Sequence, residues 1–324
     1  MIGKPRQWVL FAIAAMVALA LAVPGSPALA APPVKVGLVV PLTGKLAPFG
    51  QSSREALEIA VKFINDAGGV KGLNGAKIQV LPVDAGSDPT SAGSATQRLL
   101  SRQKVSAVIG CFASSLSLAA SEVTERNRVP FLTMSFTDKL TERGFKYIFQ
   151  IVPKASVIGA GQVKQAMEIA KKVGRPLKRI AIVFEDTAYG SSQADGLNAE
   201  AKRLGLDVAL KEGYPSGITD VTPLIQKIRM AKADILFPVS YFTDAVLIIR
   251  SMRQGGMVTP VFGGAAGYVI PEFRKALGDL VNGIFSINTS NYDHYGKLGK
   301  AYRKKVGKFM PHEAFEHAVC LYVL

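Results

Sequence analysis

The sequence predicts an α/β protein of two similar lobes, each built on a parallel, doubly wound sheet. Three observations predict this fold. Short β-branched apolar runs alternate with helical patterns, the alternation is repeated in the second half of the chain, and 324 residues with 48% hydrophobic residues are enough for two cores. No low-complexity linker separates the halves, so we expect short extended connections between the lobes.

The first half of the chain contains the first series of alternating elements. The apolar runs predict strands at 34–42, 76–84, 105–109, 129–134 and 147–152. The helical patterns between them predict helices that end near 65 and 102 and one at 116–126. Pro153 ends the last of these strands and marks the passage to the second series.

The second series repeats the same order of elements. We expect helices at 156–173, 190–204, 219–230 and 243–254, and strands at 179–184, 207–212, 234–239, 260–263 and 283–287. Two further helical patterns, at 293–308 and 313–324, follow the last strand. We assign 31–154 together with 289–324 to the first lobe, and 155–288 to the second.

The first 30 residues have the three parts of a secretory signal peptide. Lys4 and Arg6 form a basic start, Val9–Val23 is an uninterrupted apolar run, and Ala28-Leu29-Ala30 is a small-x-small cleavage site. The apolar run is short for a membrane span. We therefore expect an exported, soluble protein whose mature chain begins near Ala31.

The remaining chain is basic, with 37 Lys and Arg against 24 Asp and Glu after the signal is removed. The positive charge is spread over most of the chain, and its densest run, within 297–308, has the spacing of a solvated helix face without interleaved aromatic residues. An exported protein also rarely meets nucleic acid. We expect attraction to anionic solutes or to a membrane surface, and no nucleic-acid partner.

Cysteine and histidine usage predicts neither a disulfide scaffold nor a metal site. Cys111 and Cys320 are too few for a scaffold, so we expect buried free thiols. The sequence His312-Glu313-Ala314-Phe315-Glu316-His317 resembles a zinc-protease motif, but its histidines are five residues apart and lie about 140° apart on a helix. We expect surface histidines here and at His294, with no metal and no cofactor.

Catalytic signatures are also missing from the sequence. It contains no phosphate-binding loop, no nucleophile elbow and no glycine-rich dinucleotide motif after the first strand. Glu185 and Asp186 adjoin at a strand end and should point in opposite directions, which makes them a poor acid–base pair. We therefore expect a protein that is not an enzyme.

Ligands of open α/β sheets bind beyond the carboxyl ends of the strands, and in two facing lobes these ends line one cleft. The segment 105–117 has the clearest candidate site, because a strand and a small-residue turn lead into a helix that begins with Ser114 and Ser115. The free N–H groups of such a helix end form an anion site. The alternative is that one serine only caps the helix.

The chain resembles the periplasmic solute-binding proteins of the branched-chain amino acid type, which serve ABC transporters. The resemblance runs from about Val34 to the last residue. Its motifs are GLVVPLTGKLAPFGQ at 37–51, INDAGGVKGLNGAKIQV at 64–80, DAGSDPTSA at 84–92, VIGCFASS at 108–115, LTERGFKYIFQIVP at 140–153 and FEDTAYG at 184–190. It implies two Rossmann-like lobes of the type I periplasmic binding fold, joined by three crossovers and closing on a ligand.

The resemblance also implies the ligand-binding residues. A serine after the third strand, here Ser114 or Ser115, would hold the ligand carboxylate with nearby N–H groups. After the fourth strand, Phe136 stands where the family usually has a threonine. The hydroxyl that binds the ligand would therefore come from Ser135 or Thr137. The residues implied in this way are Phe49, Ser114, Ser115, Ser135, Phe136, Thr137, Tyr189 and Tyr241, with the two tyrosines closing from the second lobe.

One departure from the family concerns the ligand's ammonium group. In the amino-acid binders an acidic residue near Ala266 pairs with that group, and this chain has Gly264-Ala265-Ala266-Gly267 instead. A buried unpaired ammonium costs several kcal/mol. Unless Asp244 or Glu185 substitutes, we expect an aromatic or aliphatic organic acid in preference to an amino acid.

A second departure is the end of the sequence, since the family continues past a helix like 313–324 with more elements and the third crossover. We therefore expect a C-terminally truncated first lobe, in a fragment or in a compromised product. The function predicted is that of a periplasmic binding component that works with an ABC permease pair, and we expect it to act as a monomer. The alternatives are a sensory ligand-binding domain and an α/β enzyme.

Overall fold

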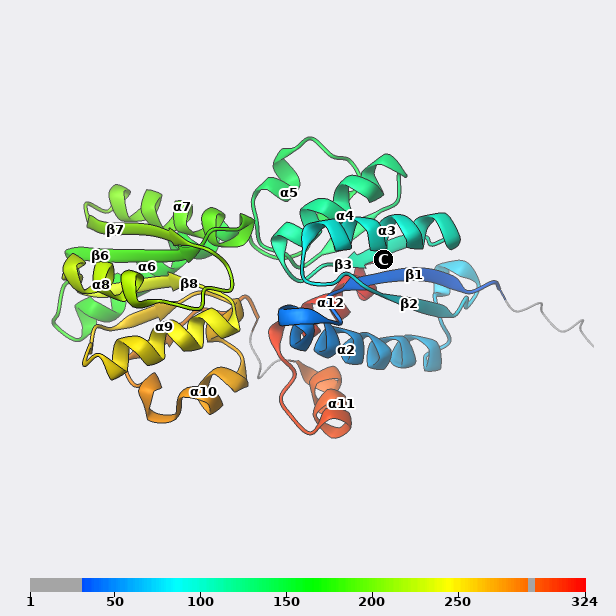
Figure 1. Ribbon diagram of the computed structural model, residues 1–324. Coiled ribbons are helices and arrows are strands. Elements are labelled where there is room, and N and C mark those ends of the chain that lie inside the picture. The colour runs from blue at the N-terminus through cyan, green and yellow to red at the C-terminus, as the bar shows by residue number, and fades with distance from the viewer. Residues whose placement is uncertain (1–30, 291–294) are drawn as a thin grey trace, which may run out of the picture.

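The computed structural model describes residues 31–290 and 295–324, and the expected signal peptide lies outside these residues. Figure 1 shows two lobes side by side, and each contains one five-stranded sheet in which every paired strand runs parallel. The first sheet has the order β2-β1-β3-β4-β5. Its strands are β1 (Val34–Val40), β2 (Ile78–Asp84), β3 (Ala107–Gly110), β4 (Phe131–Thr133) and β5 (Ile148–Gln150).

The second sheet has the order β10-β9-β8-β6-β7. Its strands are β6 (Arg179–Glu185), β7 (Asp207–Tyr214), β8 (Ile235–Val239), β9 (Val261–Gly263) and β10 (Ile284–Ser286). In both sheets the first strand lies next to one edge; the second strand forms that edge, and the chain then crosses back and builds strand by strand to the other edge. This is the doubly wound arrangement that the sequence predicts. The fold class is thus confirmed.

Helices cover both faces of each sheet. In the first lobe these are α2 (Ala47–Asp66), α3 (Pro89–Arg102), α4 (Ser114–Arg126), α5 (Lys139–Glu142), α11 (Gly296–Val306) and α12 (His312–Val323). In the second they are α6 (Ala155–Lys172), α7 (Ala188–Arg203), α8 (Thr222–Ala231), α9 (Phe242–Gln254) and α10 (Pro271–Leu277). Each of the longer helices lies within a few residues of a predicted one.

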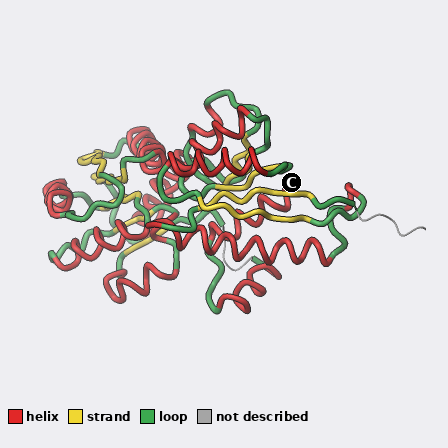
Figure 2. Tube along the Cα trace, turned by 45° about the vertical axis from the view of Figure 1, so that its right-hand side comes forward, coloured by secondary structure: helices red, strands yellow, loops and turns green. Residues whose placement is uncertain are grey.

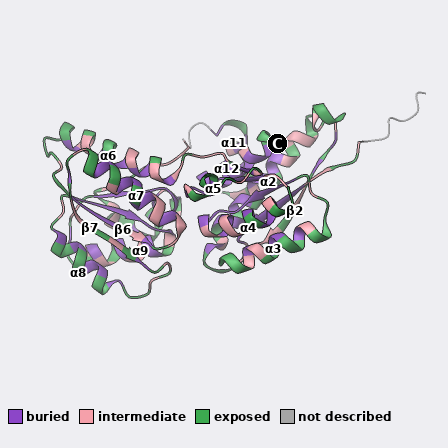
Figure 3. Cartoon of the chain, turned by 90° about the horizontal axis from the view of Figure 1, so that it is seen from above, coloured by how far each residue is buried: buried purple, intermediate pink, exposed green. Residues whose placement is uncertain are grey.

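The pleat of β1 explains how the first lobe divides its core. Val36, Leu38 and Val40 belong to the apolar cluster that α2, α11 and α12 cover, whereas Val39 belongs to the cluster on the α3–α4 face. Because successive side chains of a strand point to opposite faces, a strand buried on both faces must be apolar throughout. After Lys35, which is only half-buried, the rest of β1 (residues 36–40) is uncharged and buried and satisfies this requirement. Figure 3 shows the buried sheets inside their exposed helices.

The chain passes from the first sheet to the second between β5 and α6, and it returns between β10 and α11. Loops join the strands to their helices where the two lobes meet (Figure 2). The residues that follow β3 and β4 in the first lobe contact those that follow β6 and β8 in the second, and Lys45, after β1, contacts Ser216, after β7. The carboxyl ends of the two sheets therefore face one another.

No described helix is both long and apolar enough to cross a bilayer.

Candidate functional site

A continuous chain of aromatic rings joins the two lobes, and we call it the ring chain. It begins in the first lobe with two stacked rings, passes through two tyrosines of the second lobe, and returns to the first. The successive ring centroids are 4.1, 5.8, 5.5, 5.9 and 6.3 Å apart. Its members, in order, are Phe49, Phe112, Tyr241, Tyr189, Phe136 and His312, and all are buried.

The ring chain exists because of where the strands end. Phe49 lies in the connection that follows β1, and Phe112 and Phe136 follow β3 and β4. Tyr189 and Tyr241 follow β6 and β8 of the second lobe. Since parallel strands end at one edge of their sheet, residues far apart in sequence meet there. The structure therefore brings together the four aromatic residues that the sequence predicts, Phe49, Phe136, Tyr189 and Tyr241, and it adds Phe112.

Ser114 is the first residue of α4, but its hydroxyl does not cap that helix. Its Oγ accepts a hydrogen bond from the Thr137 N–H at 3.1 Å, and Ala113 occupies the N-cap position without a side-chain bond. The Ser114 hydroxyl thus ties the turn after β3 to the turn after β4. The Ser114 hydroxyl can still donate its own proton to an acceptor that enters the cleft.

Tyr241 lies against this start of α4. Burial raises the pKa of its phenol well above the usual value, the nearby Glu185 and Tyr189 raise it further, and the Ser114 backbone N–H partly opposes the shift. A backbone N–H at the start of a helix is also where an anion would bind.

The hydroxyls on either side of Phe136 have different partners. Ser135 Oγ lies 2.7 Å from the Cys111 carbonyl oxygen, 2.9 Å from that of Phe112 and 2.6 Å from Ser117 Oγ, so it holds the turn after β3. Thr137 Oγ1 reaches across to the second lobe, 2.8 Å from Ser192 Oγ. Thr137 is accordingly the better placed of the two to meet a ligand. Ser115 is half-buried beside Ser114.

The two acids considered as substitutes for the missing carboxylate are both bonded to backbone N–H groups. Glu185 is fully buried, and its two oxygens accept the Thr187 and Gly190 N–H groups at 2.9 and 2.7 Å. Burial raises the pKa of Glu185 in spite of these bonds. Its neighbour Asp186 is exposed, which confirms that the pair points in opposite directions.

Asp244 lies in the first turn of α9, where its Oδ2 accepts the Gly217 N–H at 3.0 Å. Burial raises its pKa, and the Gly217 N–H and the charge of Lys45 lower it. Ala266 is buried in the loop after β9, where the Ala265 carbonyl accepts the Tyr189 hydroxyl at 2.9 Å and the Gly267 N–H donates to the Ser240 carbonyl at 3.2 Å. Its φ is +68°, a conformation that favours glycine. Position 266 therefore offers a ligand a methyl group and no charge.

A cavity of about 210 Å³ opens between the lobes at one end of the ring chain. Lys45 and Phe49 line it from the first lobe, and Tyr241 and Asp244 are among the residues that line it from the second. Lys45 Nζ donates to the Ser216 carbonyl and lies 3.3 Å from its hydroxyl, which links the lobes at this edge. A larger cavity of about 410 Å³ lies against the amino ends of β8 and β9, remote from these residues.

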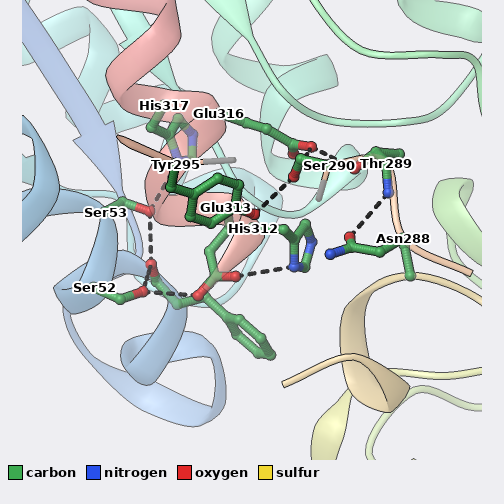
Figure 4. Close-up of polar contacts among 12 residues, drawn as sticks. Ser52, Ser53, Asn288, Thr289, Ser290, Tyr295, His312, Glu313, Glu316 and His317 are labelled. Carbon is green, nitrogen blue, oxygen red and sulfur yellow. Dashed lines mark hydrogen bonds and ion pairs between the residues drawn. The ribbon is translucent and has the colours of Figure 1, made fainter. Parts of the chain in front are cut away.

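The other end of the ring chain has a polar cluster, which we call the α12 cluster: His312, Glu313, Glu316 and His317, with Asn288, Thr289 and Ser290 of the returning crossover. Figure 4 shows it between α2, α12 and that crossover. Glu313 Oε1 accepts the Ser52 hydroxyl at 2.8 Å, and His317 Nδ1 lies 2.8 Å from Ser53 Oγ. Glu316 Oε1 accepts the hydroxyls of Thr289 and Ser290.

The expectation that these histidines lie on the surface is wrong. His312 and His317 are fully buried because α12 lies inside the lobe, packed on α2 and on β3 and β4. Burial lowers the pKa of His312 to about 3 and that of His317 to about 4, and it raises the pKa of Glu313 to about 7 and of Glu316 to about 8. Both histidines are therefore neutral at pH 7. His294 lies outside the described residues.

The two cysteines lie inside the first lobe, Cys111 after β3 and Cys320 in α12. Cys111 and Cys320 are buried and free, as expected. Burial raises the pKa of Cys111 to about 12 and also raises that of Cys320. Within residues 31–290 and 295–324, no group of three or more His, Cys, Asp and Glu residues is arranged to hold a metal ion.

Comparison with known proteins shows the family. The family model of the periplasmic binding proteins matches residues 33–321, nearly the whole described chain. The chain belongs to the periplasmic binding protein family. It is 34% identical over 287 residues to the Leu/Ile/Val-binding protein homolog 8 of Brucella abortus (strain 2308), an alignment that covers 85% of this chain and 70% of the relative.

Solved structures of the family share the fold of this periplasmic binding protein. The substrate-binding protein LivJ from Streptococcus pneumoniae, in complex with isoleucine, has a TM-score of 0.78 at 24% identity, covering 90% of this chain and 82% of that one. A solute-binding protein of an ABC transporter from R. palustris, in complex with benzoate, has a TM-score of 0.78 at 19% identity, covering 90% and 79%. The two-lobed type I fold that the sequence predicts is thus confirmed.

The family fixes the class of activity but not the ligand. Periplasmic binding proteins bind small molecules outside the cytoplasm and work with ABC transporter permeases, and the relatives of this chain are solute-binding proteins, not enzymes. Neighbours with the same fold bind isoleucine in one case and benzoate in another. The choice between such ligands depends on the side chains of the cleft.

Proposed function

We propose that this protein is the periplasmic binding component of an ABC transporter for a small carboxylate, and that the carboxylate is an organic acid without an α-ammonium group. Ligand would bind between the lobes, with its carboxylate at the start of α4 and its apolar part among the rings of the ring chain. Contacts with both lobes are complete only in the closed form, so ligand shifts the population toward closure. The permease pair would then receive the closed, monomeric form.

The observation that carries this proposal is the set of partners of the acids near Ser114. An α-ammonium lies two bonds from its carboxylate, so its counter-ion must lie beside Ser114. Burial raises the pKa of Glu185, which favours its uncharged form, and its two oxygens already accept backbone N–H groups. Ala266 has no carboxylate. Burying an ammonium there without a partner would cost several kcal/mol. A carboxylate without that group avoids the cost.

The aromatic rings support the same ligand class. Between the lobes, Phe112 contacts Tyr241 and Phe136 contacts Tyr189. A flat aromatic ligand that enters between these rings would replace the contacts they make with one another by similar contacts with its own ring. Aromatic pairs of this kind contribute about 0.5–1.5 kcal/mol beyond their buried area. Benzoate-type acids fit this environment better than a branched aliphatic amino acid.

Titration calorimetry of the purified protein with benzoate, cyclohexanecarboxylate and leucine tests the proposal. We expect either acid to bind more tightly than leucine. Ser114→Ala should weaken acid binding by about 1.5–3 kcal/mol, or roughly tenfold to a hundredfold, because it removes a hydrogen bond to a charged group. Tight leucine binding, or no binding of either acid, would refute the choice of ligand.

Two controls make the Ser114→Ala result interpretable. Ser94→Ala removes a hydroxyl from an exposed position of α3 and should leave affinity unchanged. Ser114→Ala also deprives the buried Thr137 N–H of its acceptor, so a loss of about 1–3 kcal/mol in unfolding free energy is expected. Unfolding curves of both variants separate that loss of stability from the loss of affinity. Light scattering of the same samples tests the monomer.

A further inference from the structure

Several buried polar atoms of the described residues have no hydrogen-bond partner within the protein, and they are concentrated where the lobes meet. Buried polar groups are normally hydrogen-bonded, so each exception requires an explanation. The atoms belong to the start of α7, to the returning crossover and to α12. They are Thr187 Oγ1, Gln193 Oε1, Asn288 Nδ2, His312 Nδ1 and Nε2, Glu313 Oε2, Glu316 Oε2 and His317 Nε2.

His312 and Asn288 stand out because they face each other from different elements. In Figure 4 the Asn288 amide nitrogen is turned toward the His312 imidazole. The Asn288 oxygen is already used, since it accepts the Thr289 N–H at 2.9 Å. The atom of this amide that has no partner is therefore the donor Nδ2, and it faces the His312 imidazole.

The His312 ring is held in one orientation by its neighbours. It stacks on Phe136 with an interplanar angle of 13°, and its Nδ1 lies 3.2 Å from Glu313 Oε2. Nδ1 makes no hydrogen bond there, although it lies within ion-pair distance of the Glu313 carboxyl. In the tautomer whose proton is on Nδ1 and faces that carboxyl, Nε2 is an acceptor. The imidazole is fully buried, which makes an acceptor without a partner costly.

An acceptor and a donor that face one position are complementary to a hydroxyl group. A hydroxyl donates its proton to one partner and accepts from another, whereas a methyl group satisfies neither and an ammonium cannot accept. The position adjoins Phe136, at the end of the ring chain remote from the cavity beside Phe49 and Asp244. From Tyr241, beside the start of α4, the ring chain reaches His312 through Tyr189 and Phe136.

We propose that His312 Nε2 and Asn288 Nδ2 form a subsite for a hydroxyl group at the end of the ligand opposite its carboxylate, so that the ligand class is a ring-hydroxylated aromatic acid. This inference rests on the proposed function, since it assumes that the carboxylate binds at Ser114. The ring of such a ligand lies among Phe136 and the two tyrosines. Its hydroxyl gives both unpartnered atoms a hydrogen bond when the lobes close.

The test compares benzoate with 4-hydroxybenzoate, which differ only in the hydroxyl opposite the carboxylate. In calorimetric titrations of the purified protein we expect 4-hydroxybenzoate to bind at least about tenfold more tightly, because sites built to bond a hydroxyl reject the analogue that lacks it. His312→Phe retains an aromatic ring against Phe136 and removes both nitrogens. In that variant the ratio of the two affinities should fall to about one.

Asn288→Asp provides a second variant, which keeps an acceptor for the Thr289 N–H and replaces the amide donor with a carboxyl oxygen, and it should also lower the ratio. Ser94→Ala should leave the ratio as in the wild type. Equal affinities for the two acids in the wild type, or an unchanged ratio in both variants, would overturn the subsite while acid binding still supports the proposed function. Binding of neither acid would overturn both proposals.

Discussion

The buried carboxyl of Glu316 allows the packing of α12 to be tested without a ligand. Its side chain is 4% exposed, and burial together with the charge of Glu313 raises its pKa to about 8 although the Thr289 and Ser290 hydroxyls lower it. In the unfolded chain the same carboxyl titrates near 4.5. Between these pH values the folded protein holds a proton that the unfolded chain lacks. Its contribution to stability is therefore complete below pH 4.5 and is lost as the pH rises through 8.

The size of the effect follows from the one proton involved. Each pH unit lowers the unfolding free energy by about 1.4 kcal/mol, so Glu316 accounts for roughly 2 kcal/mol between pH 6.5 and 8. Glu313, with a pKa of about 7, adds to the loss at the start of this range. His312 and His317 have lowered pKa values and act in the opposite direction, but only below their unfolded value of 6.5. Above pH 6.5 the contribution of Glu313 and Glu316 therefore outweighs that of the two histidines.

Glu316→Gln replaces the carboxyl with a neutral group of the same shape that still accepts from Thr289 and Ser290. Between pH 6.5 and 8, we expect the unfolding free energy of Glu316→Gln to fall by about 2 kcal/mol less than that of the wild type. Urea unfolding at both pH values measures the difference. Glu168→Gln removes the same charge from an exposed position of α6 and should follow the wild type. If the unfolding free energies of Glu316→Gln and the wild type fell by the same amount between pH 6.5 and 8, Glu316 would not be protonated in the folded state.

Two other predictions follow from single positions. Cys111 and Cys320 should not react with a thiol reagent in the native protein, because each is buried and has a raised pKa, and both should react in urea. Rapid labelling of either thiol under native conditions would contradict the packing of α12. Ala266→Glu should strengthen leucine binding by about 1.5–3 kcal/mol in calorimetric titrations, by supplying a carboxylate for the ammonium. Unchanged leucine affinity in a folded Ala266→Glu protein would remove the argument from position 266.

The alternation of strands and helices was readable from the sequence because each element carries its own periodicity. The short, valine-rich run of β1 is typical of a strand buried on both faces, and the structure places helices on both. The short helices α5 and α10 were not predicted. Segments of four and seven residues contain at most two helical turns, which is too short for a repeating apolar pattern.

The ring chain was partly readable for the same reason. Phe49, Tyr189 and Tyr241 lie at the starts of the helices that follow β1, β6 and β8, and strands of one parallel sheet end at one edge. Phe112 follows a strand as well, but in the sequence it is one apolar residue in a turn whose serines drew the prediction. Its role depends on a stacking partner from another strand end, Phe49, and no local pattern specifies that contact.

The α12 cluster could not be predicted from spacing, because spacing tests only whether two side chains share a helix face. The polar residues of α12 form one stripe, and an exposed stripe would have the same sequence. What buries it is α2, whose Ser52 and Ser53 are more than 250 residues earlier in the chain and bond to Glu313 and His317. Burial of this kind is a property of the assembled lobe.

The position of this cluster bears directly on the charge of the ligand. Glu313 has an unpartnered oxygen, so it could be taken as the counter-ion that position 266 lacks. The geometry argues against this: Glu313 belongs to the His312 end of the ring chain, whereas an α-ammonium must stay beside the carboxylate at Ser114. Asp244 is nearer to that end, but it is bonded to a backbone N–H and shares its cavity with Lys45. The cleft thus offers its free polar groups at the far end of the ligand, where a hydroxyl can use them and an α-ammonium cannot reach.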